Sequence, residues 1–135
     1  MLSYDDEYLV EIDKGKLMVL FRDYCGELSG HYYMYQSGST DSGYTWFAPY
    51  VSPIRGFSPH VIHLQNDWLW VVYGKRWVPF GKYAYISREQ SKTWEVENVI
   101  KLTDVPNGDF GYSASVQLDD SSIWMVYYQD SLIPG

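Results

Sequence analysis

The chain has 135 residues, a formal net charge of −7 at pH 7, and an aromatic content of 19% that includes 14 tyrosines and 6 tryptophans. This length allows at most one domain with a useful core, and the abundance of aromatic residues favours strands over helices. The 10 basic residues are scattered rather than clustered, which argues against a nucleic-acid partner because phosphate binding needs a basic face.

Membrane association and cofactor binding are not expected either. No stretch approaches the roughly 18 apolar residues of a membrane span, and the N-terminal residues do not resemble a signal peptide. The single cysteine, Cys25, excludes an internal disulfide and a multi-cysteine zinc site, and we interpret it as an ordinary packed side chain. We therefore predict no metal, no cofactor and no membrane partner, and the cellular location stays open.

The first predicted element is a pair of strands joined by a tight turn, over residues 8–21. After four turn-like residues, Leu17, Val19 and Phe21 form an apolar stripe at alternate positions. Alternation with period two is typical of a half-buried strand. A third strand is predicted over residues 32–37.

This third strand leads into an eight-residue box, Ser-Thr-Asp-Ser-Gly-Tyr-Thr-Trp, at residues 39–46. We interpret the box as the turn between a third and a fourth strand. Ser39 and Asp41 hydrogen-bond to backbone groups, and Gly43 permits a positive φ. Thr45 and Trp46 then begin the outer strand, with Trp46 packed between neighbouring sheets. The box is thus predicted to be structural rather than catalytic.

The strand pair occurs twice more, over residues 60–73 and 115–128. Each copy has an apolar residue, four turn-like residues and an alternating stripe, and the apolar residues that open the turns are Ile12, Leu64 and Leu118. The copies are 52 and 54 residues apart, a period typical of repeat architectures. The stripes of the two later copies are Leu69, Val71 and Tyr73, and Ile123, Met125 and Tyr127.

A degenerate second box follows another predicted strand at 82–87. It keeps Ser87, Thr93 and Trp94 but has Glu89 in place of aspartate and Ser91 in place of glycine, so we expect a looser turn. The repeating unit is then four antiparallel strands in about 50 residues, the size of a β-propeller blade. We predict an all-β chain with blade-like repeats at about 4–54, 55–104 and 105–135, the last ending after its second strand.

Boxes at this spacing within four-strand repeats resemble the Asp-box, or bacterial neuraminidase repeat, of the sialidase superfamily. The resemblance extends over essentially the whole chain. It implies a six-bladed β-propeller, of which this chain is similar to the last three blades, about two and a half in strand content. In that family three arginines bind the substrate carboxylate, a tyrosine assisted by a glutamate is the nucleophile, and an aspartate is the acid/base. Bidentate guanidinium–carboxylate pairing explains the arginines, and a neutral nucleophile suits a sugar that carries a carboxylate.

The resemblance assigns roles to five residues. Asp6 falls at the family's glutamate position, with Glu7 as the neighbouring candidate, and Arg22 falls at the second arginine. Arg76, just after the second strand of the next repeat, is similar to the third arginine. Tyr112, within the sequence Gly-Tyr-Ser, resembles the nucleophile.

Several alternatives remain beside these assignments. Arg22 and Arg76 also fit the description of strand-end surface charges, and Arg55, on the loop before an inner strand, is a weaker candidate for substrate contact. His60 and His63 point to opposite faces of one strand, which argues against a metal site.

The resemblance implies a retaining, sialidase-like glycoside hydrolase that binds a carbohydrate with an anionic terminal sugar. The family's first arginine and acid/base aspartate have no counterpart in this sequence. Activity would therefore need further blades, supplied by a homo-oligomer or by a missing propeller half. The competing interpretation is a non-catalytic carbohydrate-binding or scaffolding fragment, and a third is an inactive truncated reading frame.

Overall fold

The structure, a computed structural model, describes residues 4–23 and 31–130. Within these ranges the chain forms ten β-strands and one short 3-10 helix, η1 (Val96–Asn98), and no α-helix. The strands are β1 (Tyr4–Asp13), β2 (Lys16–Asp23), β3 (Tyr33–Ser39), β4 (Tyr50–Arg55), β5 (Phe57–His63), β6 (Leu69–Lys75), β7 (Gly81–Ser87), β8 (Ile100–Asp104), β9 (Phe110–Gln117) and β10 (Ile123–Gln129). Cys25, predicted to be packed, lies outside the described residues.

The strands form three antiparallel sheets. Sheet A contains β1 to β4 in sequence order, sheet B contains β5 to β8 in sequence order, and sheet C pairs β9 with β10. The all-β prediction is therefore confirmed, as are the three strand pairs and the third strands, which the structure places at β3 and β7. The described part of the chain has no helix long and apolar enough to cross a membrane.

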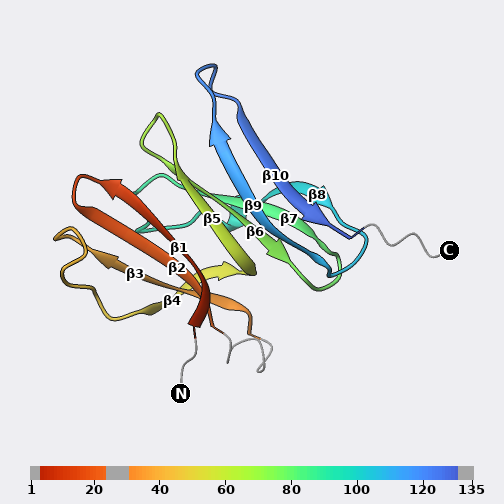
Figure 1. Cartoon of the computed structure of the whole chain (residues 1–135), viewed down its shortest axis with the longest axis horizontal. Coiled ribbons are helices and arrows are strands. Elements are labelled where there is room, and N and C mark those ends of the chain that lie inside the picture. The colour runs from red at the N-terminus through yellow and green to blue at the C-terminus, as the bar shows by residue number, and fades with distance from the viewer. Residues whose placement is uncertain (1–3, 24–30, 131–135) are drawn as a thin grey trace.

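The first strands of the three sheets lie side by side, with β5 between β1 and β9 (Figure 1). His60, on β5, connects all three. Its Nε2 lies 3.0 Å from the Tyr8 hydroxyl on β1, and its Nδ1 accepts a hydrogen bond of 3.3 Å from the Ser115 amide on β9. Equivalent or adjacent repeat positions on β1, β5 and β9 are thereby brought together.

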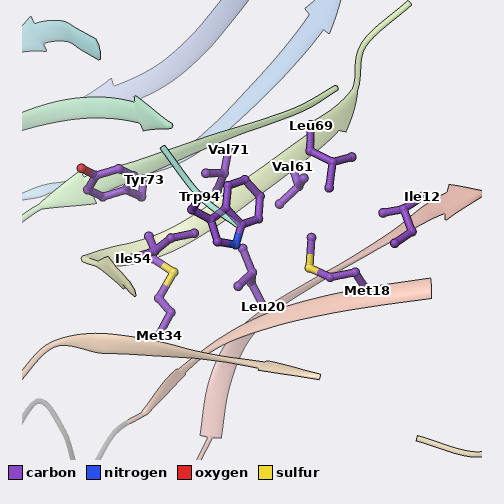
Figure 2. Packing of buried hydrophobic residues seen from close by; sticks show 10 residues of the cluster. All are labelled: Ile12, Met18, Leu20, Met34, Ile54, Val61, Leu69, Val71, Tyr73 and Trp94. Atoms are coloured by element: carbon purple, nitrogen blue, oxygen red, sulfur yellow. The ribbon is translucent and has the colours of Figure 1, made fainter. Parts of the chain in front are cut away.

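The larger core fills the space between sheets A and B (Figure 2). Met18 and Leu20 of β2 meet Leu69 and Val71 of β6, and all four are 1% exposed or less. A second core between sheets B and C packs Trp70, Val72 and Ala84 against Ile123 and Met125 of β10. Alternate residues of β6 thus contribute to different cores, because successive side chains of a strand point to opposite faces.

The first box is a closed hydrogen-bonded turn. The Ser39 hydroxyl donates to Asp41 Oδ1 at 2.8 Å and accepts from the Gly43 amide at 2.9 Å. Both the amide and the hydroxyl of Thr45 donate to the Asp41 carboxylate. These donors, led by the Thr45 hydroxyl, lower the pKa of Asp41 to about 2, which keeps it ionised.

The second box makes fewer of these bonds. Ser87 Oγ accepts from the Ser91 amide at 2.9 Å and Thr93 Oγ1 donates to Glu89 at 3.0 Å, and Ser91 takes the positive φ that Gly43 has in the first box.

The tryptophans of the two boxes have different environments, and the prediction for Trp46 is wrong in two respects. The outer strand β4 begins at Tyr50 rather than at residues 45–46, and Trp46 does not pack between sheets. Trp46 is 42% exposed and its indole donates to the Gly43 carbonyl within its own turn. Trp94 instead lies between two sheets, 6% exposed, and its Nε1 donates to Gln36 on β3 at 2.9 Å. The reason is the position of the sheets: Trp94 extends toward the sheet that precedes its own, and among the described residues no sheet precedes sheet A.

Replacing Gly43 with alanine is expected to lower the free energy of unfolding by about 1–2 kcal/mol, the usual cost of a left-handed conformation for a residue with a Cβ. Its φ is +89°, and an added Cβ would meet Leu17 Cδ1 at 3.2 Å. Urea denaturation would measure the loss. Gly108→Ala is the matched control, because a Cβ there makes only ordinary contacts from 3.5 Å outward. Equal effects for both variants would contradict the role assigned to the turn.

Candidate functional site

The same irregularity occurs at the same repeat position in β1, β5 and β9. The pairing register shifts between Asp5 and Tyr8, between Phe57 and His60, and between Gly111 and Ala114. In each case two residues of the first strand face one residue of its neighbour, which is a β-bulge, and bulges often redirect side chains near functional sites.

The bulges bring together three side chains that are repeat equivalents, Asp6, Ser58 and Tyr112. The Tyr112 hydroxyl donates to Asp6 Oδ1 at 3.1 Å, and the Ser58 hydroxyl donates to Asp6 Oδ2 at 3.3 Å. Asp6 and Ser58 both have a φ of +50°, an unfavourable conformation for residues with a Cβ. The Asp6 carboxylate is thus held between hydroxyls from two other sheets.

Arg22 supplies the positive charge of this cluster from the neighbouring strand β2. Its Nε and Nη2 each donate to one carboxylate oxygen of Asp5 at 2.7 Å, a bidentate pair. Its Nη1 lies 3.4 Å from Asp6 Oδ2. The hydrogen bonds from Arg22 lower the pKa of Asp5, and they outweigh the opposing effect of burial.

Arg76 approaches the cluster from the end of β6. Its Nη2 donates to the Phe110 carbonyl at 2.9 Å, and its guanidinium lies 5.3 Å from the centre of the Phe57 ring. The Arg22 guanidinium lies 5.6 Å from the centre of the same ring, so the buried Phe57 contacts both arginines. The hydrogen bonds of both guanidiniums occupy part of their donor capacity.

The phenol of Tyr112 responds to both kinds of charge. The negative charge of Asp6, followed by the hydrogen bond to it, raises the pKa of Tyr112, while the charges of Arg76 and Arg22 act in the opposite direction. The phenol therefore carries its proton at neutral pH and donates it to Asp6.

A small pocket opens at this cluster. It has a volume of ≈ 190 Å³ and is lined by Asp6, Glu7, Tyr8, Ser58, Pro59, His60, Tyr112 and Ser113. Burial lowers the pKa of His60, so the ring is neutral at neutral pH; with Nδ1 accepting from Ser115, its Nε2 carries the proton and donates to the Tyr8 hydroxyl. The pocket therefore combines a carboxylate, a phenol and a neutral imidazole.

The structure brings Asp6, Arg22, Arg76 and Tyr112 into one region, with Glu7 in the pocket wall. Arg55 is the last residue of β4 rather than part of a loop; its guanidinium is 4.9 Å from the Trp77 ring and its Nε donates to the His31 carbonyl. The Trp77 ring in turn lies 6.2 Å from the Phe57 ring, so the aromatic cluster around Arg55 adjoins the ring that Arg22 and Arg76 contact.

Sequence reasoning missed Asp5, Ser58 and Tyr8, and it considered His60 without placing it in this site. For Ser58 a signal existed, because it stands 52 residues after Asp6 and 54 before Tyr112, the spacings of the repeat. No group of three or more His, Asp or Glu side chains in the described ranges is arranged to hold a metal ion.

Comparisons with known proteins give the fold only. No protein-family model matches the chain, and no curated protein does. A solved structure, the crystal structure of a protein of unknown function from Dyadobacter fermentans DSM 18053, is similar with a TM-score of 0.80 and 24% sequence identity. The similarity covers 96% of this chain and 35% of that chain, so this chain spans about a third of the length of the protein it matches. The chain shares a three-sheet, all-β architecture with part of a longer protein.

Proposed function

We propose that this chain is a piece of a sialidase-like β-propeller whose Tyr112–Asp6 pair acts in a glycoside hydrolase, on a carbohydrate with an anionic terminal sugar. The observation that carries the proposal is the 3.1 Å hydrogen bond from the Tyr112 hydroxyl to Asp6, two residues that are 106 positions apart. The Asp-box resemblance independently assigns these two residues to the nucleophile and its base.

The chemistry follows from this pair. The Tyr112 oxygen forms a bond to the anomeric carbon, its proton passes to Asp6, and the bond to the aglycone breaks with its electron pair on the leaving oxygen. Water then hydrolyses the tyrosyl–sugar bond, which gives net retention of configuration. Arg22 and Arg76, which both contact the Phe57 ring, supply positive charge for the substrate carboxylate.

The experiment is turnover of an aryl sialoside by the chain. An aryl leaving group departs as a stabilised phenolate. Its departure therefore depends less on the acid/base aspartate, which has no counterpart in this sequence. We expect release of the phenol by the wild type and a loss of about 100-fold or more in Tyr112→Phe, the typical scale of one catalytic group.

Two further variants control this test. Tyr44→Phe alters a tyrosine that is 89% exposed, in the turn after β3, and should leave turnover unchanged. Asp6→Asn keeps the shape of the cluster but removes the base, and should lower turnover as Tyr112→Phe does. Equal turnover in Tyr112→Phe and the wild type would refute the nucleophile assignment.

A non-catalytic carbohydrate-binding role is the second candidate, and it is favoured by the lack of a counterpart in this sequence for the family's acid/base aspartate, which turnover needs and binding does not. This role predicts saturable binding of the same sialoside, measured by calorimetry, without turnover. Absence of both binding and turnover would reject both proposals.

A further inference from the structure

The two outer sheets each have one apolar face that no described residue of another sheet covers. On sheet C the face carries Trp124 and Val126 of β10, 65% and 69% exposed. On sheet A it carries Leu9 of β1 and Val51 of β4, both 54% exposed. We name these the C face and the A face.

The C face is the repeat equivalent of two faces that are buried. Trp124 and Val126 stand 54 residues after Trp70 and Val72, the residues of sheet B that sheet C covers. Trp70 and Val72 are 8% and 0% exposed. One repeat earlier, Met18 and Leu20 occupy the same positions and are covered by sheet B. In two of three sheets this face receives the next sheet.

The A face corresponds to the other partner in that contact, the face with which each sheet packs on the sheet before it. Leu17 and Val19 of β2 stand 52 residues before Leu69 and Val71. Leu69 and Val71 are the residues of sheet B that pack on sheet A. The equivalents in sheet C, Ile123 and Met125, pack on sheet B. Leu9 shares the A face because it is the cross-strand partner of Val19. The A face is thus of the kind that packs onto a preceding sheet.

We propose that the A face of a second copy of this chain packs on the C face of the first. The contact repeats the packing of sheet B on sheet A and of sheet C on sheet B, so it continues an interface type that the chain already forms twice. Two such contacts close a ring of two copies and six sheets. The contact is heterologous, since different surfaces of the two copies meet.

A single chain carries both complementary surfaces, and this is the reason for naming a second copy as the occupant. Each face is apolar and continuous with a buried sheet interface, and two-stranded sheet C also presents β10 as an edge strand. The proposal is independent of the glycosidase activity, because it uses none of the pocket residues.

Light scattering coupled to size exclusion tests the proposal. We expect the wild type to have twice the mass of one 15.8 kDa chain. Trp124→Glu and Leu9→Glu should each be monomeric, with dissociation constants raised at least tenfold. Tyr44→Glu, which places a charge at an exposed residue in the turn after β3, should stay dimeric. Far-ultraviolet circular dichroism should show the same strand content in all variants.

Mixing the two charged variants separates this contact from a symmetric one. A mixed pair can form one contact between the unaltered C face of Leu9→Glu and the unaltered A face of Trp124→Glu. We therefore expect dimers in the mixture although each variant alone is monomeric. A monomeric wild type would overturn the proposal and leave the faces to a different chain, and a dimer that survives Trp124→Glu, or a mixture that stays monomeric, would overturn it as well.

Discussion

Replacing Lys82 with methionine is expected to raise the free energy of unfolding by about 2 kcal/mol at neutral pH. Lys82 is on β7 and has no exposed surface, and its Nζ is without a hydrogen-bond partner among the described residues. Burial, and to a lesser extent the charge of Arg76, lower its pKa from 10.5 to about 8. That shift corresponds to about 3 kcal/mol of cost for the charged amine. Methionine fills a similar volume without a charge, but it loses the cation–π contact with Phe110.

The gain should depend on pH in a defined direction. Between pH 8 and 10.5 the unfolded chain keeps the Lys82 proton that the folded chain has released, so this group makes the wild type more stable as pH rises. The advantage of Lys82→Met is therefore largest near neutral pH and shrinks toward about pH 10, where ordinary tyrosines begin to titrate. Urea denaturation at a series of pH values measures it.

The matched control for Lys82 is on the adjacent strand. Lys101 of β8 has a side chain that is 49% exposed and forms an ion pair with Asp104, so Lys101→Met should show no stabilisation and no rising trend. A Lys82→Met variant less stable than the wild type at neutral pH would mean that the amine has a favourable partner.

The repeat made most of this fold predictable from the sequence. The spacings of 52 and 54 residues align three hairpins, and alternation within β2, β6 and β10 separates the residues of neighbouring cores. The environments of Trp46 and Trp94 could not be separated in this way, because burial depends on whether a sheet lies beside the box rather than on the box itself.

The contacts within the site could be predicted from the sequence only where the strand register could be predicted. If the pairing of Asp13 with Lys16 continued without interruption, Arg22 would face Glu7 across the β1–β2 pair. Two register shifts along β1 change that partner to Asp5, and the sequence gives no sign of either shift. Asp6 and Tyr112 were identified by family resemblance, whereas their contact depends on bulges in β1 and β9 that alternation patterns do not reveal.

Arg55 was placed with the site because it precedes an inner strand, and the structure shows why loop position was a weak guide. Its guanidinium lies over the rings of Tyr32 and Trp77, which come from loops before β3 and after β6. The residues of this cluster are far apart in the sequence and are not separated by the repeat spacing. Cation–π attraction to these rings holds the guanidinium in an aromatic cluster that adjoins Phe57.

Replacing Arg22 with methionine is expected to lower the free energy of unfolding by about 1–2 kcal/mol at neutral pH, between the cost of breaking an exposed ion pair and that of breaking a fully buried one. The variant leaves Asp5 and Asp6 adjacent without the guanidinium that contacts both. The side chains of Arg22 and Asp6 are 15% and 18% exposed and that of Asp5 is 43% exposed, so water compensates for much of the lost contact with Asp5 and for less of that with Asp6. Arg22→Lys should give an intermediate loss, because it keeps the charge but not the bidentate geometry.

The stability loss in Arg22→Met should become smaller at acid pH. This pH dependence distinguishes the charge contribution of Arg22 from its packing contribution. Arg22 lowers the pKa of Asp5, so its contribution is complete above the ordinary aspartate pKa of about 4 and disappears as pH falls through the lowered value. The wild type and Arg22→Met should therefore converge in urea denaturation as the pH falls below about 4. Arg88→Met, which breaks the more exposed Arg88–Glu95 pair, should cost less than about 1 kcal/mol. A loss in Arg22→Met that stays constant down to the lowest pH would assign the effect to packing against Phe57, and the charge cluster around Asp6 would then contribute nothing to the stability of the site.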